Sequence, residues 1–187
     1  AGAVYILFKN SDGSVLSNQK ISAHEGGYNE TLDAGNFFGY GVAGIGDYND
    51  DGIPDIAVSS PTSPNNSLYI IHLYENGTVK SYVKNENIIA QGLSAIGDIN
   101  NDNRIDLLFL DEDSHVMSSS TVTISSTLGG FGEGLVNGDE FGGRETAMLG
   151  DIDNDGSIEL AVGAFMSDLG KGAIWILSLD PTTFNVI

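Results

Sequence analysis

The chain combines a large excess of acidic side chains with a complete lack of cysteine. Its 187 residues include 26 Asp or Glu against 7 Lys or Arg, for a formal net charge of −19, and 41% of them are hydrophobic. Such a charge repels phosphate backbones and anionic membranes, so no nucleic acid partner is expected. The lack of cysteine excludes both a disulfide framework and a thiolate metal site. No apolar run approaches the roughly 18–20 residues that span a bilayer, so no membrane insertion is expected.

Short runs of β-branched and aromatic residues, separated by turns rich in Gly, Asn and Pro, predict strands along the whole chain. Residues 75–77 (Glu-Asn-Gly) form a hairpin signal between two of these runs. Residues 129–143 are rich in glycine and are predicted to form a connection. No segment carries apolar residues at helical spacing through two turns, so no helix is expected. The predicted strands are residues 4–8, 15–21, 40–46, 56–59, 68–74, 79–83, 93–97, 107–110, 116, 122–124, 146–150, 160–163, 173–177 and 184–187.

Three loops repeat one pattern of oxygen-bearing side chains. The first loop, residues 47–55, reads Asp-Tyr-Asn-Asp-Asp-Gly-Ile-Pro-Asp. The second loop, residues 98–106, reads Asp-Ile-Asn-Asn-Asp-Asn-Arg-Ile-Asp, and the third loop, residues 151–159, reads Asp-Ile-Asp-Asn-Asp-Gly-Ser-Ile-Glu. Oxygens at alternate positions can surround a hard cation such as Ca²⁺, which takes roughly six to eight oxygen ligands. Gly52 permits the sharp turn because it lacks a Cβ, and the carbonyl of Ile53 is expected to face the ion.

The loops recur at a spacing of roughly 50 residues, which is in the range of propeller blades. Each unit reads as strand, loop, strand, connection, strand, hairpin and strand, which makes one four-stranded antiparallel blade. The sequence therefore predicts an all-β protein of about three and a half blades, left incomplete or completed by other chains at its exposed edges. The predicted organisation is a single propeller region over residues 1–187: trailing strands of a partial blade (1–36), repeat 1 (37–88), repeat 2 (89–139) and repeat 3 (140–187).

This pattern resembles the FG-GAP repeat, the blade unit of the integrin α-subunit propeller and of many bacterial surface proteins. The family motif has Phe-Gly before the first strand and Gly-Ala-Pro after the second, on either side of the Asp-rich loop. Repeat 1 carries Phe-Gly at residues 38–39 and Ser-Ser-Pro at residues 59–61. Repeat 3 carries Phe-Gly at residues 141–142 and Gly-Ala-Phe at residues 163–165. The resemblance covers nearly the whole chain.

Repeat 2 departs from the family motif. It has Gln-Gly at residues 91–92 in place of Phe-Gly, and Leu-Asp-Glu at residues 110–112 in place of Gly-Ala-Pro. Asn103 stands where the other two loops have glycine. Asn tolerates the left-handed backbone conformation better than other residues with a side chain. The second loop is therefore expected to bind an ion still, with weaker affinity.

The resemblance implies one structural Ca²⁺ in each loop, about three ions in all. In each loop the first, third, fifth and ninth residues would bind through their side chains, and the seventh through its carbonyl. The ion would fold the connection between the first two strands of a blade, so that its binding energy becomes folding energy. The ligands implied are Asp47, Asn49, Asp51, Ile53, Asp55, Asp98, Asn100, Asp102, Arg104, Asp106, Asp151, Asp153, Asp155, Ser157 and Glu159.

Two other structures could place Asp and Asn at this spacing. An EF-hand has a bidentate Glu at position 12 and helices on both sides of its loop. Position 12 is instead Val58, Phe109 or Val162, each inside a strand-like run. Ordinary Asx-rich turns without a metal would explain one such loop, because Asp, Asn and Gly favour turns for local reasons. Three loops in the same register favour cation binding.

No catalytic constellation is evident in the sequence. The three histidines, His24, His72 and His115, fall in different parts of the repeat, and none has a nucleophile beside it. The carboxylates are accounted for by metal binding, and Ca²⁺ activates water poorly compared with the metals that hydrolases use. We therefore expect that the protein is not an enzyme.

The resemblance implies a secreted or cell-surface structural and adhesive module that binds other proteins. The expected calcium binding supports a place outside the cell, because such loops are often filled only where Ca²⁺ is abundant. Two alternatives stay open. One is a subunit of a self-assembling filament or ring whose blades are completed by copies of the chain. The other is a carbohydrate-binding, lectin-like propeller whose partners are glycans.

Two further features bear on carbohydrate. Tyr5 and Trp175 occupy equivalent repeat positions and are interpreted as blade packing rather than as a sugar-binding platform. Asn29, Asn65 and Asn76 each begin an Asn-x-Ser/Thr triplet in a predicted loop, so each is a candidate glycosylation site in a secreted protein.

Overall fold

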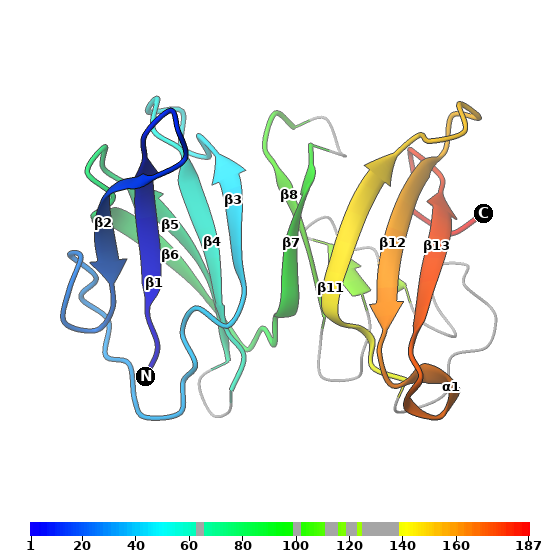
Figure 1. The fold of residues 1–187 in the computed structure, drawn as a ribbon, viewed down its shortest axis with the longest axis horizontal. Helices are drawn as coiled ribbons and strands as arrows, with labels where there is room; N and C mark the ends of the chain where they lie inside the picture. The colour runs from blue at the N-terminus through cyan, green and yellow to red at the C-terminus, as the bar shows by residue number, and fades with distance from the viewer. Residues whose placement is uncertain (63–65, 99–101, 111–115, 119–122, 125–138) are drawn as a thin grey trace. The chain divides into compact units, whose positions relative to one another are not determined.

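The computed structural model describes residues 1–62, 66–98, 102–110, 116–118, 123–124 and 139–187. Short strands joined by turns make up nearly all of its regular structure (Figure 1). The chain divides into two compact units, residues 1–90 and residues 91–187. In every sheet, neighbouring strands are antiparallel and follow chain order, as they do in a propeller blade. The predicted all-β fold with blade-like antiparallel sheets is confirmed.

The first unit contains a two-stranded sheet, β1–β2, and a four-stranded sheet, β3–β4–β5–β6. The turn predicted between the last two strands is present, since Gly77 donates to the Tyr74 carbonyl at 2.8 Å and Tyr74 donates to the Thr78 carbonyl at 2.9 Å. The strands are β1 (Val4–Lys9), β2 (Val15–Ile21), β3 (Val42–Gly46), β4 (Asp55–Ser60), β5 (Ser67–Leu73) and β6 (Val79–Glu86).

One hydrophobic cluster joins the two sheets of the first unit. Val4 and Ile21 of the two-stranded sheet pack with Val58 of β4 in this cluster. Phe38, which precedes β3, is 1% exposed, and its ring stacks on Tyr28 at 4.8 Å between centroids. Aromatic side chains bury large apolar areas. The Phe-Gly segment before β3 is therefore anchored in the core rather than displayed on the surface.

The second unit contains the sheets β7–β8–β9–β10 and β11–β12–β13. Ile96 and Leu108 of the first sheet share a core cluster with Leu160 and Leu177 of the second. The elements are β7 (Gln91–Gly97), β8 (Asp106–Leu110), β9 (Val116–Ser118), β10 (Thr123–Ile124), β11 (Phe141–Gly150), β12 (Ile158–Ala164), α1 (Ser167–Gly170) and β13 (Ala173–Leu179).

The two aromatic residues predicted to pack between blades differ. Trp175 packs against the core cluster of the second unit, as predicted. Tyr5 is 55% exposed, so the prediction is wrong for this residue. Alternate residues of a strand face opposite sides of the sheet. In β1 it is Val4 and Ile6 that face the core of the first unit, and Tyr5 lies on the other face.

Strand β11 corrects one predicted boundary. It begins at Phe141, so residues 141–143 are strand rather than connection, and Phe141 pairs with Ala164. The pairing register shifts between Phe141 and Thr146, where a bulge accommodates the extra residues. Glycine lowers strand propensity, which is why the composition of this segment did not indicate a strand. The rest of the predicted connection up to residue 138 lies outside the described residues.

The C-terminal part of the chain differs from prediction at two places. Residues 184–187 do not form a strand but a single bridge between Leu179 and Val186. A four-residue element, α1, was not expected. Asp168 and Leu169 within it have φ of 50° and 59°, so it is a turn with left-handed residues rather than a periodic helix. The described residues contain no other helix, and four residues cannot cross a bilayer.

Candidate metal centres

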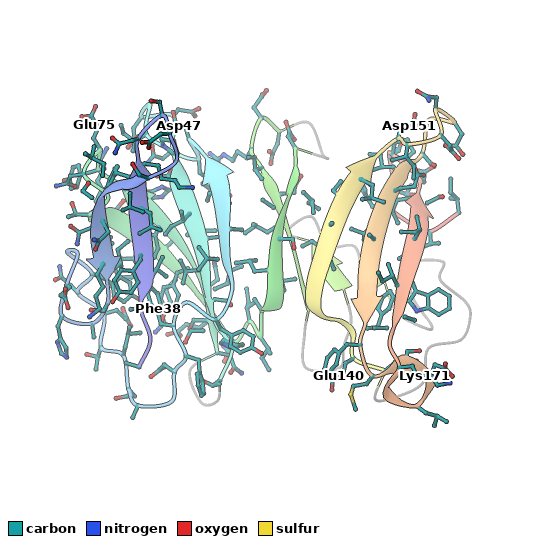
Figure 2. All side chains as sticks on the ribbon, in the orientation of Figure 1. Phe38, Asp47, Glu75, Glu140, Asp151 and Lys171 are labelled. Atoms are coloured by element: carbon teal, nitrogen blue, oxygen red, sulfur yellow. The ribbon has the colours of Figure 1, made fainter. Side chains whose placement is uncertain are left out.

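Each predicted loop lies between two paired strands. The first loop connects β3 to β4, the second β7 to β8 and the third β11 to β12, and Figure 2 shows Asp47 and Asp151 at the tips of their hairpins. The ninth residue of each loop pairs with the glycine that precedes the first residue, so the two ends of the ligand run meet. These pairs are Gly46–Asp55, Gly97–Asp106 and Gly150–Glu159. Position 12 lies within a strand in all three cases, which excludes an EF-hand.

The carboxylate at the first position organises the turn in the same way in all three loops. Asp47 Oδ1 accepts the N–H of Asp51 at 2.9 Å, and its Oδ2 accepts the N–H of Gly52 at 2.7 Å. A carboxylate that accepts two backbone N–H groups fixes the loop backbone around itself. The equivalent bonds run to Asp98 from Asp102 (3.0 Å) and Asn103 (2.8 Å), and to Asp151 from Asp155 (3.1 Å) and Gly156 (3.0 Å).

The sixth residue of each loop has a left-handed backbone. The φ angles are 88° at Gly52, 68° at Asn103 and 91° at Gly156. The second loop thus makes the same turn with asparagine in place of glycine. Asparagine adopts the left-handed conformation more readily than most other residues that have a side chain. The fifth-position carboxylate then accepts the N–H of the seventh residue, at 2.9 Å in the first and second loops and 2.7 Å in the third.

The ninth-position carboxylate is buried between strands. Asp55 is 1% exposed and accepts N–H groups from Tyr48 at 3.2 Å and Leu73 at 3.1 Å. His72 Nδ1 lies 2.8 Å from Oδ2 of the same residue. In the third loop, Glu159 is 3% exposed and accepts the N–H of Ile152 at 2.9 Å. These bonds fix the orientation of the carboxylate.

One predicted ligand of the first loop has an unsatisfied oxygen. Oδ1 of Asn49 is buried and accepts no hydrogen bond. A buried acceptor without a partner costs roughly 1–3 kcal/mol. Amide oxygens are ligands that Ca²⁺ accepts readily, and a bound cation would satisfy this atom. The residues of the first loop therefore fit a hard cation.

The third loop gathers three carboxylates. Ligand oxygens of Asp151, Asp153 and Glu159 all lie within 4.8 Å of one another, the one group of three acidic, His or Cys side chains this close among the residues that the structure describes. Like charges at such distances repel, and a divalent cation between them converts the repulsion into attraction. The donor set is all oxygen, which suits Ca²⁺ better than a transition metal.

Hydrogen bonds keep two carboxyls of the third loop ionised. The Ser157 hydroxyl, followed by the Ser157 N–H, lowers the pKa of Asp155 below its usual value of 3.8. The Ile152 N–H, followed by the Ser157 hydroxyl, lowers the pKa of Glu159 below 4.5. Ionised carboxylates are the forms that bind metal, so these two residues need no deprotonation step near neutral pH.

Three side chains take part that the sequence did not indicate. Lys80 Nζ lies 2.7 Å from Asp51 Oδ2 and, ahead of the Ile53 N–H, lowers the pKa of Asp51. His72 contacts Asp55 from β5, at the register position that Ser178 occupies opposite Glu159. The hydroxyl of Ser157 donates to the third loop, although only its carbonyl was predicted to take part.

The second loop is described in part. Asp98 and Asp102 make the turn, and Asp106 is 4% exposed at the start of β8. Asn100 lies outside the described residues. The carbonyl ligands predicted at the seventh position, at Ile53, Arg104 and Ser157, stay predictions.

Two comparisons with known proteins indicate what this chain is similar to. Residues 47–109, which run from the first loop through the second, match the FG-GAP-like repeat. Over 169 residues the chain is 31% identical to "Integrin alpha-V" of Gallus gallus, and the match covers 81% of this chain and 16% of that protein. The predicted resemblance to FG-GAP repeats of integrin α-subunits is confirmed. The chain spans about 16% of the length of this relative.

Two candidate glycosylation sites lie on the surface of the protein. Asn29 and Asn76 are exposed, and the side chain of Asn76 accepts hydrogen bonds from the N–H and hydroxyl of Thr78. Asn65 lies outside the described residues.

Proposed function

We propose that this chain is a calcium-stabilised, extracellular structural and adhesive module that mediates protein–protein interaction. The observation that carries the proposal is the convergence of Asp151, Asp153 and Glu159 oxygens within 4.8 Å in a loop whose backbone turn recurs in the other two loops. About three Ca²⁺ ions, one in each loop, would stabilise the hairpins from which the blades are built.

The similarity to integrin alpha-V supports protein partners and a place outside the cell or at its surface. Calcium is abundant enough there to fill loops of moderate affinity. The charge of −19 argues against nucleic acid. We also propose that the protein is not an enzyme. His72 is engaged with Asp55 and His24 is exposed, while His115 lies outside the described residues.

The proposal is tested by titrating the calcium-free full chain with CaCl₂ in a calorimeter. We expect saturable binding of about three ions, together with a rise in Tm that grows with calcium concentration. MgCl₂ is the matched control, because Mg²⁺ demands octahedral geometry and dehydrates reluctantly. If no heat of calcium binding were detected and the Tm were unchanged after chelation, the metal assignment would be contradicted.

Self-assembly is a second candidate, favoured by one observation. The β1–β2 sheet exposes a run of apolar side chains on its outer face: Tyr5 is 55%, Leu7 53% and Leu16 69% exposed. Exposed apolar faces of this kind mark interaction sites. Light scattering in millimolar CaCl₂ tests the candidate. A monomer of 19.7 kDa excludes it, and a large species that dissociates on chelation supports it. Glycan binding stays a prediction from the resemblance.

A further inference from the structure

The turn between β5 and β6 carries a dipeptide that can react with itself. Residues 76–77 are Asn-Gly. The backbone nitrogen that follows an asparagine can attack the side-chain amide carbon, and glycine hinders this attack least because it has no side chain. Figure 2 shows the neighbouring residue, Glu75, near the end of the first unit where Asp47 lies. The dipeptide is nevertheless separate from the three candidate metal loops, since it belongs to none of them.

The folded turn engages both of the groups that would react. The Gly77 N–H donates to the Tyr74 carbonyl at 2.8 Å, so the attacking nitrogen is held by another partner. Oδ1 of Asn76 accepts the N–H of Thr78 at 3.0 Å and its hydroxyl at 2.7 Å. This Asx turn fixes the side-chain amide against Thr78. Closure of a ring between the Gly77 nitrogen and the Asn76 side chain therefore requires the turn to open.

The β1–β2 sheet packs against this turn. Gly77 is buried, although Asn76 beside it is exposed. A Cβ added to Gly77 would lie 3.2 Å from both Cζ of Phe8 and Cβ of Gln19. The same Cβ would lie 3.3 Å from Cβ of Ile6. Strands from another part of the first unit thus enclose the glycine, and the turn can open only when it separates from the β1–β2 sheet.

We propose that Asn76 is a self-modification site whose reaction is released when the β1–β2 sheet separates from the β5–β6 turn. The Gly77 nitrogen then loses its proton and bonds to Cγ of Asn76, and Nδ2 leaves with a proton as ammonia. Water opens the resulting cyclic imide at either carbonyl, which yields aspartate or isoaspartate. The reaction consumes water and needs no oxidant. The inference goes beyond the proposed function and rests on neither the calcium sites nor adhesion.

The two products are expected to affect the turn differently. Aspartate preserves it, because Asp12 in the β1–β2 turn accepts the N–H of Ser14 at 2.9 Å and its hydroxyl at 2.6 Å, with a glycine between them. Isoaspartate instead routes the main chain through the side-chain carbons and adds a methylene group before Gly77. The enclosure of Gly77 leaves no room for the longer chain. Isoaspartate at residue 76 is therefore expected to prevent the β1–β2 sheet from packing on the turn again.

The test follows the full chain, produced without glycosylation, by peptide mapping and mass spectrometry at neutral pH. Mapping separates Asn76 from residues 137–138, the other Asn-Gly dipeptide. The chain unfolded in urea gives the rate of the open dipeptide. Because opening is fast relative to the reaction, the rate in the folded chain is expected to be lower by the open fraction. Hydrogen exchange of the Gly77 amide measures this fraction independently, since it breaks the same hydrogen bond. The two reductions are expected to agree.

A pair of variants tests the role of the β1–β2 sheet. Phe8→Ala loosens the enclosure of Gly77 and is expected to accelerate the modification roughly fivefold to thirtyfold. Leu7→Ala is the matched control and is expected to leave the rate unchanged. Leu7 is the neighbouring residue of β1, 53% exposed on the other face and not in contact with the turn. Exchange of the Ile71 amide in β5 reports global unfolding and is expected to accelerate less than that of Gly77.

Several results would overturn the proposal. Modification of the folded chain as fast as in urea, or none in urea, would contradict a gated reactive site. Equal rates in Phe8→Ala and Leu7→Ala, or equal acceleration of exchange at Ile71 and Gly77, would contradict gating by the β1–β2 sheet. The effect of isoaspartate would be contradicted if the purified isoaspartate form kept the amide resonances of residues 6, 8 and 19 unchanged. Asn76→Asp is the control for that comparison and is expected to keep them.

Discussion

The first and third loops make the same turn in different electrostatic surroundings. In the first loop a lysine, Lys80, bonds to Asp51 at 2.7 Å, and a histidine, His72, lies 2.8 Å from Asp55. In the third loop, three carboxylates meet within 4.8 Å, and they accept hydrogen bonds from backbone N–H groups and from the Ser157 hydroxyl. The two loops therefore share the backbone turn. They differ in that a lysine side chain bonds to a carboxylate of the first loop, whereas the bonds named for the third loop come from uncharged donors.

This difference indicates how strongly each repeat depends on a cation. The protein itself offers the first loop a counter-charge, whereas the third loop has a fourth acidic ligand, Asp153, where the first has the neutral Asn49. Repulsion among carboxylates is relieved either by a bound cation or by loss of the folded loop. We infer that the third loop binds Ca²⁺ more tightly and is destabilised more by its removal.

Chelation has the largest expected effect. When the free calcium concentration is about 1,000 times the Kd of a site, binding contributes about 4 kcal/mol to the free energy of unfolding. This contribution disappears when the ion is removed. Amide hydrogen exchange after EDTA treatment is expected to accelerate throughout and most of all in β11 and β12. Equal loss of protection in β3–β4 and β11–β12 would show that the two loops depend on calcium to the same extent.

Exchanging the third-position ligands is expected to have the next largest effect. Asp153→Asn gives the third loop the ligand type of the first, and it should weaken calcium binding there roughly tenfold, or about 1.4 kcal/mol. Asn49→Asp makes the reciprocal change and should strengthen binding by the first loop. Calcium titration followed at the Ile152 and Tyr48 amides reads each loop separately.

Asp168→Asn is the control for this exchange, because it removes the same charge from an exposed position outside the loops. If it weakened binding as much as Asp153→Asn, net charge rather than ligand identity would account for the result.

Removing the built-in counter-charge of the first loop should have a smaller effect of opposite sign on affinity. Lys80→Met frees Oδ2 of Asp51, so calcium affinity of the first loop is expected to rise by roughly threefold to tenfold. The calcium-free protein should become less stable at the same time. Lys9→Met is the control, since it removes a lysine from β1, outside the loops. A fall in the calcium affinity of Lys80→Met would mean that Lys80 supports the bound state instead.

The smallest expected effect is the acid dependence of the calcium-free protein. The folded pKa values of Asp155 and Glu159 are lowered by their hydrogen bonds. Their contribution to stability is therefore complete above the unfolded values of 3.8 and 4.5 and is lost as pH falls through the lower folded values. The urea concentration at the midpoint of unfolding should decrease as the pH is lowered below roughly 4.5. The decrease should be smaller in Ser157→Ala, which lacks the hydroxyl. A midpoint that rises with acid would contradict this.

Much of the loop geometry was predictable because it is local. The alternation of oxygens, the left-handed sixth residue and the meeting of positions 1 and 9 all follow from a nine-residue turn between antiparallel strands. Contacts from outside the loop were not predictable in this way. His72 reaches Asp55 only because β5 pairs with β4 in one register, and Lys80 reaches Asp51 from β6. No residue spacing in the sequence fixes that register.

The strands show the same division between local and long-range information. Apolar runs such as residues 4–8 indicated strands because β-branched and aromatic residues fit a pleated, half-buried surface. Strand β11 has two glycines directly after Phe141 and its pairing register shifts there, so its pairing with β12 and not its composition makes it a strand. The exposure of Tyr5 likewise depends on which face of β1 meets a second sheet.

The central claim is that all three loops are calcium sites of unequal dependence on the ion. The most direct measurement is an amide-resolved NMR titration of the chelated full chain with CaCl₂. We expect saturable shifts confined at first to residues 151–159, followed at higher calcium by shifts in residues 47–55. Shifts in neither loop at millimolar calcium would contradict cation binding, and saturation of the first loop before the third would contradict the assigned order.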